Sequence, residues 1–260
     1  MLPRAVKGVF LACLCFIPTA ALAETHFEAA QRLLESGQET EARRALELEL
    51  QLRPNNLEAR YDLAILLTRI GHRKDAMHLY QENMKHGWHL PTVANLSAIY
   101  LKQGKPKDAI GLLEKATRKF HAEAIPWYLL AAIAEEKKNV KEADDYYRKA
   151  LKADRKNGFA HIRYARFLAS HHRLKIARKH ADRAVHLLPE CAVCFKIEGD
   201  ILRQSGHKKQ ALTAYQKAAA LSPDRAIRLD IIAMLDAIGE HRRALMIKQA
   251  LKAREAEHTP

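Results

Sequence analysis

The sequence is poor in glycine and proline, and it lacks the short motifs of common active sites. Ten glycines and nine prolines among 260 residues are too few for a disordered, low-complexity chain. No GxSxG, HExxH or phosphate-cradling glycine loop occurs, and Asp144 and Asp145 are expected on a solvated helix face. We therefore predict a protein that is not an enzyme and that binds no cofactor and no metal.

The chain does contain an alanine that recurs at intervals of 33 or 34 residues. In most copies a glycine five residues earlier marks a turn between two short helices, and Asn139 and His172 stand at or near the two turns that lack it. A fixed period in this range is the signature of a solenoid of repeats. The alanines are Ala42, Ala76, Ala109, Ala143, Ala177, Ala211 and Ala244, and the glycines are Gly37, Gly71, Gly104, Gly206 and Gly239.

Residues 192–225 carry the most complete copy of this pattern, with Gly199, Gly206, Ala211, Tyr215 and a closing Pro223. In these residues the chain resembles the tetratricopeptide repeat (TPR) family, and the resemblance covers nearly all of 24–252. It implies an all-α fold, a right-handed α-solenoid of about six to seven helix-turn-helix repeats. The expected repeats are 24–56, 57–89, 90–123, 124–157, 158–191, 192–224 and 225–252, with a polar C-terminal tail over 253–260.

The eighth position of four repeats holds alanine or glycine, namely Ala64, Ala131, Ala165 and Gly199. A small side chain lets two antiparallel helices approach closely, and large neighbours fill the remaining space. We therefore expect these positions to be buried between paired helices.

Residues 1–23 differ in kind from the repeats. Arg4 and Lys7 precede an apolar run, and Ala21-Leu22-Ala23 ends it with a small-x-small pattern, so we predict a cleaved signal peptide and a periplasmic or otherwise exported protein. An uncleaved membrane anchor and a lipoprotein modified at Cys13 are the less favoured alternatives. The remaining chain stays strongly basic, which favours acidic protein segments, anionic glycans or a membrane surface as partners. Export argues against nucleic acid.

Cys191 and Cys194 form the one compact motif with a chemical interpretation. Haem attachment requires His after the second cysteine, where this chain has Phe195, and a zinc site requires further ligands. We favour a local disulfide or two separate small residues, and a thiol-redox pair stays as a weaker alternative because a helix start lowers the pKa of a thiol.

The resemblance also implies a concave groove lined by the first helix of each repeat. Its C-terminal half is expected to be basic, with aromatic residues nearer the middle. The set does not match the clamp by which TPR cochaperones hold an acidic chaperone tail, because Tyr61 and Ile65 stand where Lys and Asn are needed. The expected partner-binding residues are Tyr61, Ile65, Arg69, Asn95, Tyr128, Arg163, Arg166, Lys196, Asp200 and Arg203.

Taken together, these features predict a scaffold for protein–protein interaction that holds an extended or helical partner segment, acidic in one version, in this groove. Exported bacterial proteins that the chain resembles act as assembly factors for envelope, pilus or secretion machines, and the resemblance implies such a role. The alternative is a module that binds an anionic glycan or a membrane surface through a basic groove, with peripheral association to the envelope.

Overall fold

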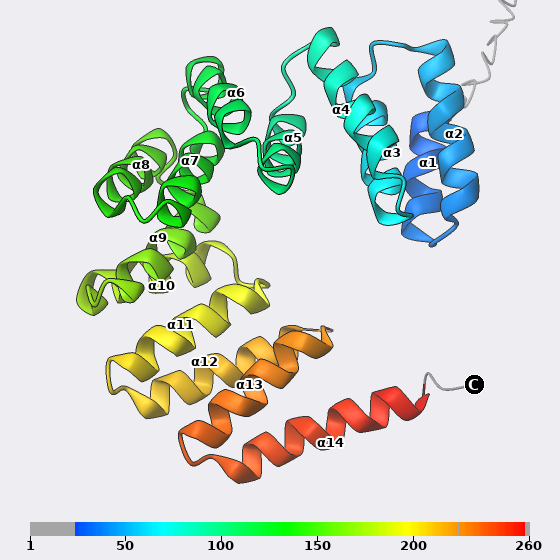
Figure 1. Ribbon diagram of the computed structural model, residues 1–260. Coiled ribbons are helices and arrows are strands. Elements are labelled where there is room, and N and C mark those ends of the chain that lie inside the picture. The colour runs from blue at the N-terminus through cyan, green and yellow to red at the C-terminus, as the bar shows by residue number, and fades with distance from the viewer. Residues whose placement is uncertain (1–23, 223, 258–260) are drawn as a thin grey trace, which may run out of the picture. The chain divides into compact units, whose positions relative to one another are not determined.

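The computed structural model describes residues 24–222 and 224–257, and these residues form helices and connecting turns only (Figure 1). The predicted signal peptide, Cys13, Pro223 and the last three residues of the predicted tail lie outside the described residues. The helices are α1 His26–Glu35, α2 Glu39–Leu52, α3 Leu57–Arg69, α4 Arg73–His86, α5 Leu90–Lys102, α6 Pro106–Lys119, α7 Ala124–Glu136, α8 Val140–Ala153, α9 Gly158–Ser170, α10 Leu174–Leu187, α11 Ala192–Gln204, α12 Lys208–Leu221, α13 Arg225–Ala237 and α14 His241–Glu257.

The helices follow the repeat period. From α3 on, every odd-numbered helix begins at the first residue of an expected repeat, and the even-numbered helix completes that repeat. The α14 helix runs to Glu257, so helix continues past residue 252, where the sequence suggested that the solenoid ends. The all-α solenoid of helical repeats predicted from the sequence is confirmed.

The turns inside the repeats use left-handed backbone. All five turn glycines have positive φ, for example 75° at Gly37 and 79° at Gly206. Where glycine is absent, Lys138 and His172 take the same region, with φ of 58° and 57°. Asn139 is the N-cap of α8, and its side-chain oxygen accepts from the Glu142 amide. The turn geometry is therefore kept even where the residue type opposes it.

The chain divides into two compact units, up to Leu79 and from Tyr80 onward, so that the boundary lies within α4. In the first unit, α2 packs against both α1 and α3. Ala30, Ala42, Leu46 and Ala64 are buried there.

In the second unit, helices pair within each repeat and each pair packs on the next, from α5–α6 to α13–α14. The first helices also contact one another directly, as α5 with α7, α7 with α9 and α9 with α11. We call α7, α9 and α11 the first-helix row and α8, α10 and α12 the second-helix row.

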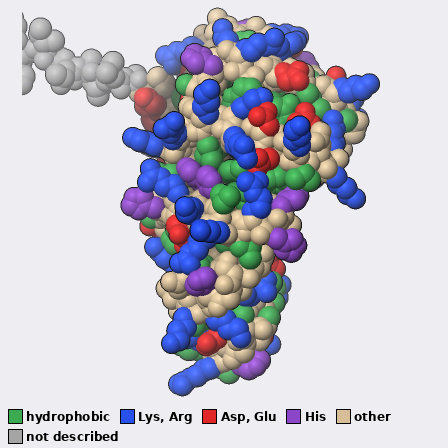
Figure 2. Space-filling model, turned by 90° about the vertical axis from the view of Figure 1, so that its left-hand side faces the viewer, with side chains coloured by type: hydrophobic (Ala, Val, Ile, Leu, Met, Phe, Trp, Pro, Cys, Tyr) green, Lys and Arg blue, Asp and Glu red, His purple; other side chains and the backbone are tan. Residues whose placement is uncertain are grey.

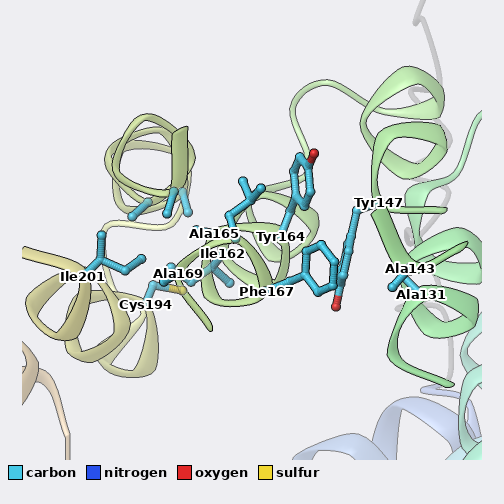
Figure 3. Close-up of a cluster of buried hydrophobic side chains, with 14 of the residues drawn as sticks. Ala131, Ala143, Tyr147, Ile162, Tyr164, Ala165, Phe167, Ala169, Cys194 and Ile201 are labelled. Atoms are coloured by element: carbon cyan, nitrogen blue, oxygen red, sulfur yellow. The ribbon is translucent and has the colours of Figure 1, made fainter. Parts of the chain in front are cut away.

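The core of this unit holds small residues against aromatic ones (Figure 3). Tyr147 of α8 stacks on Tyr164 of α9 with ring centroids 5.3 Å apart, and Phe167 lies 5.4 Å from Tyr147. At the eighth position of the next repeat, a Cβ added to Gly199 would lie 2.6 Å from Cε1 of Tyr215. The close approach expected of the small-residue positions is therefore present.

Among the described residues, no helix combines the length and apolar character needed to cross a membrane.

Candidate functional site

The ten residues expected to line one groove fall into both compact units. Tyr61, Ile65 and Arg69 lie on α3 in the first unit, where the Ile65 side chain is exposed. Arg69 is already paired, because its Nε lies 2.8 Å from Oε1 of Glu39 on α2. The other seven residues lie in the second unit, and only these can be treated as one surface.

At the N-terminal side of that surface, Asn95 on α5 donates through Nδ2 to the hydroxyl oxygen of Tyr80 at 3.2 Å. Part of its hydrogen-bonding capacity is therefore used within the unit. Asn95 also holds further contacts with the rest of the fold, so it contributes to packing as well as to the face.

An aromatic–arginine pair connects α7 and α9 in the first-helix row. The guanidinium carbon of Arg163 lies 5.0 Å from the ring centroid of Tyr128, which is within the range of a cation–π contact. Burial raises the pKa of the Tyr128 hydroxyl, and the charge of Arg163 opposes that rise. Arg166, one helical turn further on, is exposed, and the described residues give it no hydrogen bond or ion pair. In this part of the expected groove, the structure brings Tyr128 and Arg163 together, and Arg166 follows on the same helix.

Repeat six differs from the expected row of free cations. Lys196 Nζ lies 3.5 Å from Oδ2 of Asp200 and 3.5 Å from Oδ2 of Asp230 on α13. Asp200 also accepts from the Tyr215 hydroxyl at 2.8 Å. The charge of Lys196 is therefore balanced inside the fold. One of the two carboxylates, Asp230, comes from the next repeat, so the pattern of one repeat alone does not reveal it.

Arg203 ends this network. Its Nε is buried and has no hydrogen-bond partner among the described residues. Burial raises the pKa of the neighbouring Tyr215 hydroxyl, Asp200 adds to the rise and Arg203 opposes it. Arg203 therefore belongs to the packing around Tyr215 as well as to the expected groove.

The sequence prediction missed a cleft between α10 and α12 in the second-helix row. One pocket of about 390 Å³ has Arg178 and Asp182 on one wall, Lys217 on the other and Phe195 and Glu198 from α11 at its base. A second pocket of about 530 Å³ shares Arg178 and Asp182 and adds Lys175, Lys179 and His207. The two pockets therefore form one cleft, which we call the α10–α12 cleft.

This part of the molecule is rich in cations. Figure 2 shows blue Lys and Arg side chains spread over the side on which Figure 1 places α8 and α10, with fewer red acidic ones. In the sequence, α12 has three lysines, Lys208, Lys209 and Lys217, and no acidic residue. The sequence signal that could have indicated this cationic cleft is the pair of lysines at i and i+4 on the second helix of repeat five, Lys175 and Lys179.

Glu198 is the carboxyl group at the base of the cleft. Burial and the nearby charge of Asp182 raise its pKa to about 7, against the opposing charges of Lys217 and Arg178. Lys217 Nζ lies 4.3 Å from the ring centroid of Phe195, which places a cation directly above the apolar base.

A second hollow lies at the start of α11, beside the cysteine motif. The structure places a disulfide between Cys191 and Cys194, whose Cα atoms are 5.2 Å apart. Cys191 is the N-cap of α11, and its Sγ accepts from the Cys194 amide at 3.2 Å. The adjoining pocket, of about 600 Å³, is lined by apolar residues that include the exposed Phe159 and Val193.

A histidine pair couples α9 to α10. His161 Nε2 donates to the carbonyl oxygen of Arg155 at 3.2 Å, so the neutral ring accepts at Nδ1 from His180 Nδ1, 2.9 Å away. Burial lowers the pKa of His180 to about 4, helped by His161, and burial also lowers that of His161. Two rings are too few for a metal centre, and within 24–222 and 224–257 no three His, Cys, Asp or Glu residues are grouped to hold an ion.

Comparison with known proteins agrees with this fold. Family models described as tetratricopeptide repeat match residues 97–158 and 198–225. No curated protein sequence matches the chain.

Three solved structures show the likeness in three dimensions. A tetratricopeptide repeat protein from Parabacteroides merdae has a TM-score of 0.59 at 15% identity, over 88% of this chain and 91% of that chain. The pilF protein of Pseudomonas aeruginosa has a TM-score of 0.60 at 16% identity, over 80% and 96%. A chain of the APC/C hetero-tetramer Cut9–Hcn1 has a TM-score of 0.61 at 17% identity over 85% of this chain, which spans only 42% of that longer chain.

At identities of 15–17%, these likenesses show a shared fold only. Function has to be argued from the residues of the site. The repeat period, the helix pairs and the two family-model matches agree with one another. The chain is therefore a tetratricopeptide repeat protein with an α-solenoid fold.

Proposed function

We propose that this protein is a non-enzymatic scaffold for protein–protein interaction, and that it binds an extended or helical segment of a partner along α7 and α9. The observation that carries the proposal is the group formed by Tyr128, Arg163 and Arg166. Arg163 is oriented by the Tyr128 ring, and Arg166 is exposed beside it without an ion pair among the described residues.

The chemistry of this group favours a partner segment with carboxylates. An arginine can bind a carboxylate with two parallel hydrogen bonds, and a tyrosine ring adds rigid contact area at low entropic cost. Lys196 adds less, because Asp200 and Asp230 already balance its charge. The partner is therefore expected to be held mainly at repeats four and five.

The test compares two variants with the same change in charge. Arg163→Glu/Arg166→Glu is expected to lose a specific partner in a pull-down from the cell-envelope fraction. Lys115→Glu/Lys119→Glu on the exposed face of α6 is expected to keep that partner. A partner set that is unchanged in the arginine variant would place the binding surface elsewhere.

We extend the proposal to the cell envelope, with a role in assembling an envelope, pilus or secretion machine. The support is the signal-peptide pattern of residues 1–23 and the family resemblance. Fractionation of cells that produce the chain with and without these residues tests the location. An unchanged distribution between cytoplasm and envelope would contradict it.

The second candidate is a module that binds an anionic glycan or a membrane surface by charge. Attraction between exposed charges is strongly screened at about 1 M salt, whereas packed aromatic contacts are not. Partner binding that survives such salt would exclude this candidate and favour the scaffold.

A further inference from the structure

The α10–α12 cleft lies outside the first-helix row, and the proposed function does not use it. Its two pockets are open hollows of about 390 and 530 Å³ that meet at Arg178 and Asp182. The cleft therefore offers two adjoining hollows to one ligand.

The walls of the cleft are fixed and mostly cationic. Arg178 donates through Nη2 to Oε1 of Gln210 at 3.0 Å, which connects α10 to α12 across the cleft. Lys175 and Lys179 are exposed on one wall, and Lys217 is exposed on the other. Asp182 is the acidic group of the α10 wall. Its side chain is 53% exposed, and its Oδ2 lies 3.9 Å from Nε of Arg178. The balance of charge therefore favours an anion.

The base of the cleft is apolar. Phe195 and Leu202 of α11 and Ala214 of α12 line it and belong to one buried cluster. Glu198 lies among them, and because its pKa is raised to about 7 the base does not carry a full negative charge at neutral pH. Such a base accepts an apolar side chain, which a phosphate polymer does not possess.

We propose that the α10–α12 cleft is a second docking site, which binds an acidic segment of a protein partner that carries an apolar side chain. The lysines at the rim attract the carboxylates of the segment, and the apolar side chain enters the pocket at Leu202 and Ala214, beside the Lys217 ammonium that lies over the Phe195 ring. This site is separate from the Tyr128–Arg163–Arg166 surface, so the protein can hold two segments at once.

Fluorescence anisotropy with two synthetic peptides tests the proposal. One labelled peptide is rich in Glu and carries leucines, and the other has serine in place of each leucine. The leucine peptide is expected to bind about tenfold more tightly than the serine peptide, which corresponds to about 1.4 kcal/mol.

Variants locate the binding. Lys175→Ser/Lys179→Ser/Lys217→Ser is expected to weaken binding of the leucine peptide about tenfold by removing the attraction. Thr213→Trp fills the pocket from an exposed position on α12 and leaves all charges in place, and a similar loss is expected. Lys115→Glu/Lys119→Glu on α6 changes charge outside the cleft and outside the Tyr128–Arg163–Arg166 surface, and it is expected to bind this peptide as the parent does.

Three results would overturn the proposal. The first is equal binding of the leucine and serine peptides, which would indicate charge attraction alone. Displacement of the labelled leucine peptide by polyphosphate or by vesicles of anionic lipid, as effective as displacement by the unlabelled peptide, would indicate the same. The second is loss of binding in Arg163→Glu/Arg166→Glu with retention in Lys175→Ser/Lys179→Ser/Lys217→Ser. The third is full binding by Thr213→Trp that is shown by circular dichroism to be folded.

Discussion

At the residue scale, Gly199 packs closely against the ring of Tyr215. The eighth position of repeats four and five holds alanine, Ala131 and Ala165, and both are fully buried. In repeat six, the ring of Tyr215 occupies the space that a methyl group would take, and its hydroxyl is held by Asp200. Glycine is therefore required here by packing, because the backbone at Gly199 is ordinary helix.

Gly199→Ala is accordingly expected to lower the free energy of unfolding by about 1–3 kcal/mol, the usual cost of overpacking a core. Gly111→Ala in α6 is the matched control. A Cβ there meets nothing within 4 Å, so alanine is expected to raise stability by about 0.5–1 kcal/mol through helix propensity. Urea denaturation measures both variants, and equal effects of the two changes would contradict the packing argument.

Lys138 and His172 store strain at turns where the other repeats use glycine. Their positive φ is unfavourable for residues with a Cβ, whereas glycine adopts it freely. Lys138→Gly and His172→Gly are each expected to raise the free energy of unfolding by about 0.5–1 kcal/mol, after the greater entropy of glycine in the unfolded chain is subtracted. The reverse change, Gly206→Ala, is expected to lower it by about 1 kcal/mol. A loss of stability in both glycine variants would show that those side chains contribute more than the strain costs.

At the element scale, the histidine pair makes the contact between α9 and α10 sensitive to acid. Because the pKa of His180 is lowered to about 4, the folded protein keeps this ring neutral while the unfolded chain takes up a proton below its ordinary value of about 6.5. The unfolded state then binds more protons, so stability falls as the pH drops from neutrality toward the folded pKa. Protonation of His161 also removes the Nδ1–Nδ1 hydrogen bond, because Nδ1 of that ring is the acceptor, whereas a second proton on His180 goes to Nε2.

Between about pH 7 and pH 5, the parent is expected to lose about 1–2 kcal/mol of unfolding free energy from this pair. His180→Gln is expected to show less of this loss, since glutamine does not titrate. Urea denaturation at the two pH values measures the difference between the slopes. Parallel pH dependences in the parent and the variant would rule out His180 as the cause.

The start of α11 depends on the cysteine motif in two ways. Cys191 caps the helix, and Cys194 is fully buried in the core shared with α9. The bridge closes a very short loop, so the chain-entropy model gives it only about 1–2 kcal/mol. Cys191→Ser/Cys194→Ala supplies a hydroxyl oxygen as the cap in place of Sγ and keeps a buried apolar residue. The free energy of unfolding of this variant is expected to be lower by that amount. Loss of cellular function in this variant while it remains folded would favour the thiol-redox alternative.

At the scale of the whole molecule, each repeat is stabilised by its neighbours. Leu212 and Ala219 of α12 pack in one cluster with Ile231 and Leu235 of α13, and all four are buried. A repeat cannot bury this face alone, so the last pair of helices protects the repeat before it.

Ending the chain after Ser222 removes α13 and α14 and exposes that face. The free energy of unfolding is expected to fall by about 2–4 kcal/mol, and self-association is expected to increase. Leu245→Gln/Met246→Gln is the control, because these side chains of α14 are 53% and 62% exposed and contribute little to the core. Light scattering and urea denaturation measure both effects, and a truncated chain as stable as the parent would contradict the nearest-neighbour description.

Sequence reasoning was most successful where a signal repeats. The recurring alanine, the turn glycines and the small eighth position each depend on local geometry that most repeats share. For this reason the start of each helix pair, the buried alanines and the left-handed turns were accessible without coordinates.

The candidate site was only partly accessible, because its properties depend on contacts between repeats. A repeat pattern assigns Lys196 to a face, but only the tertiary structure brings Oδ2 of Asp230 on α13 within 3.5 Å of its Nζ. In the same way, the α10–α12 cleft exists because two second helices lie on either side of α11, and the pairing of His161 with His180 requires α9 and α10 to pack.

The sequence by itself therefore determined the family, the repeat period and the positions of the helices, since these follow from short-range periodicity and turn chemistry. The tertiary structure decided which charges are free and which are balanced, and where a cleft opens. Such properties arise from side chains about 30 residues apart, which become neighbours only when repeats stack.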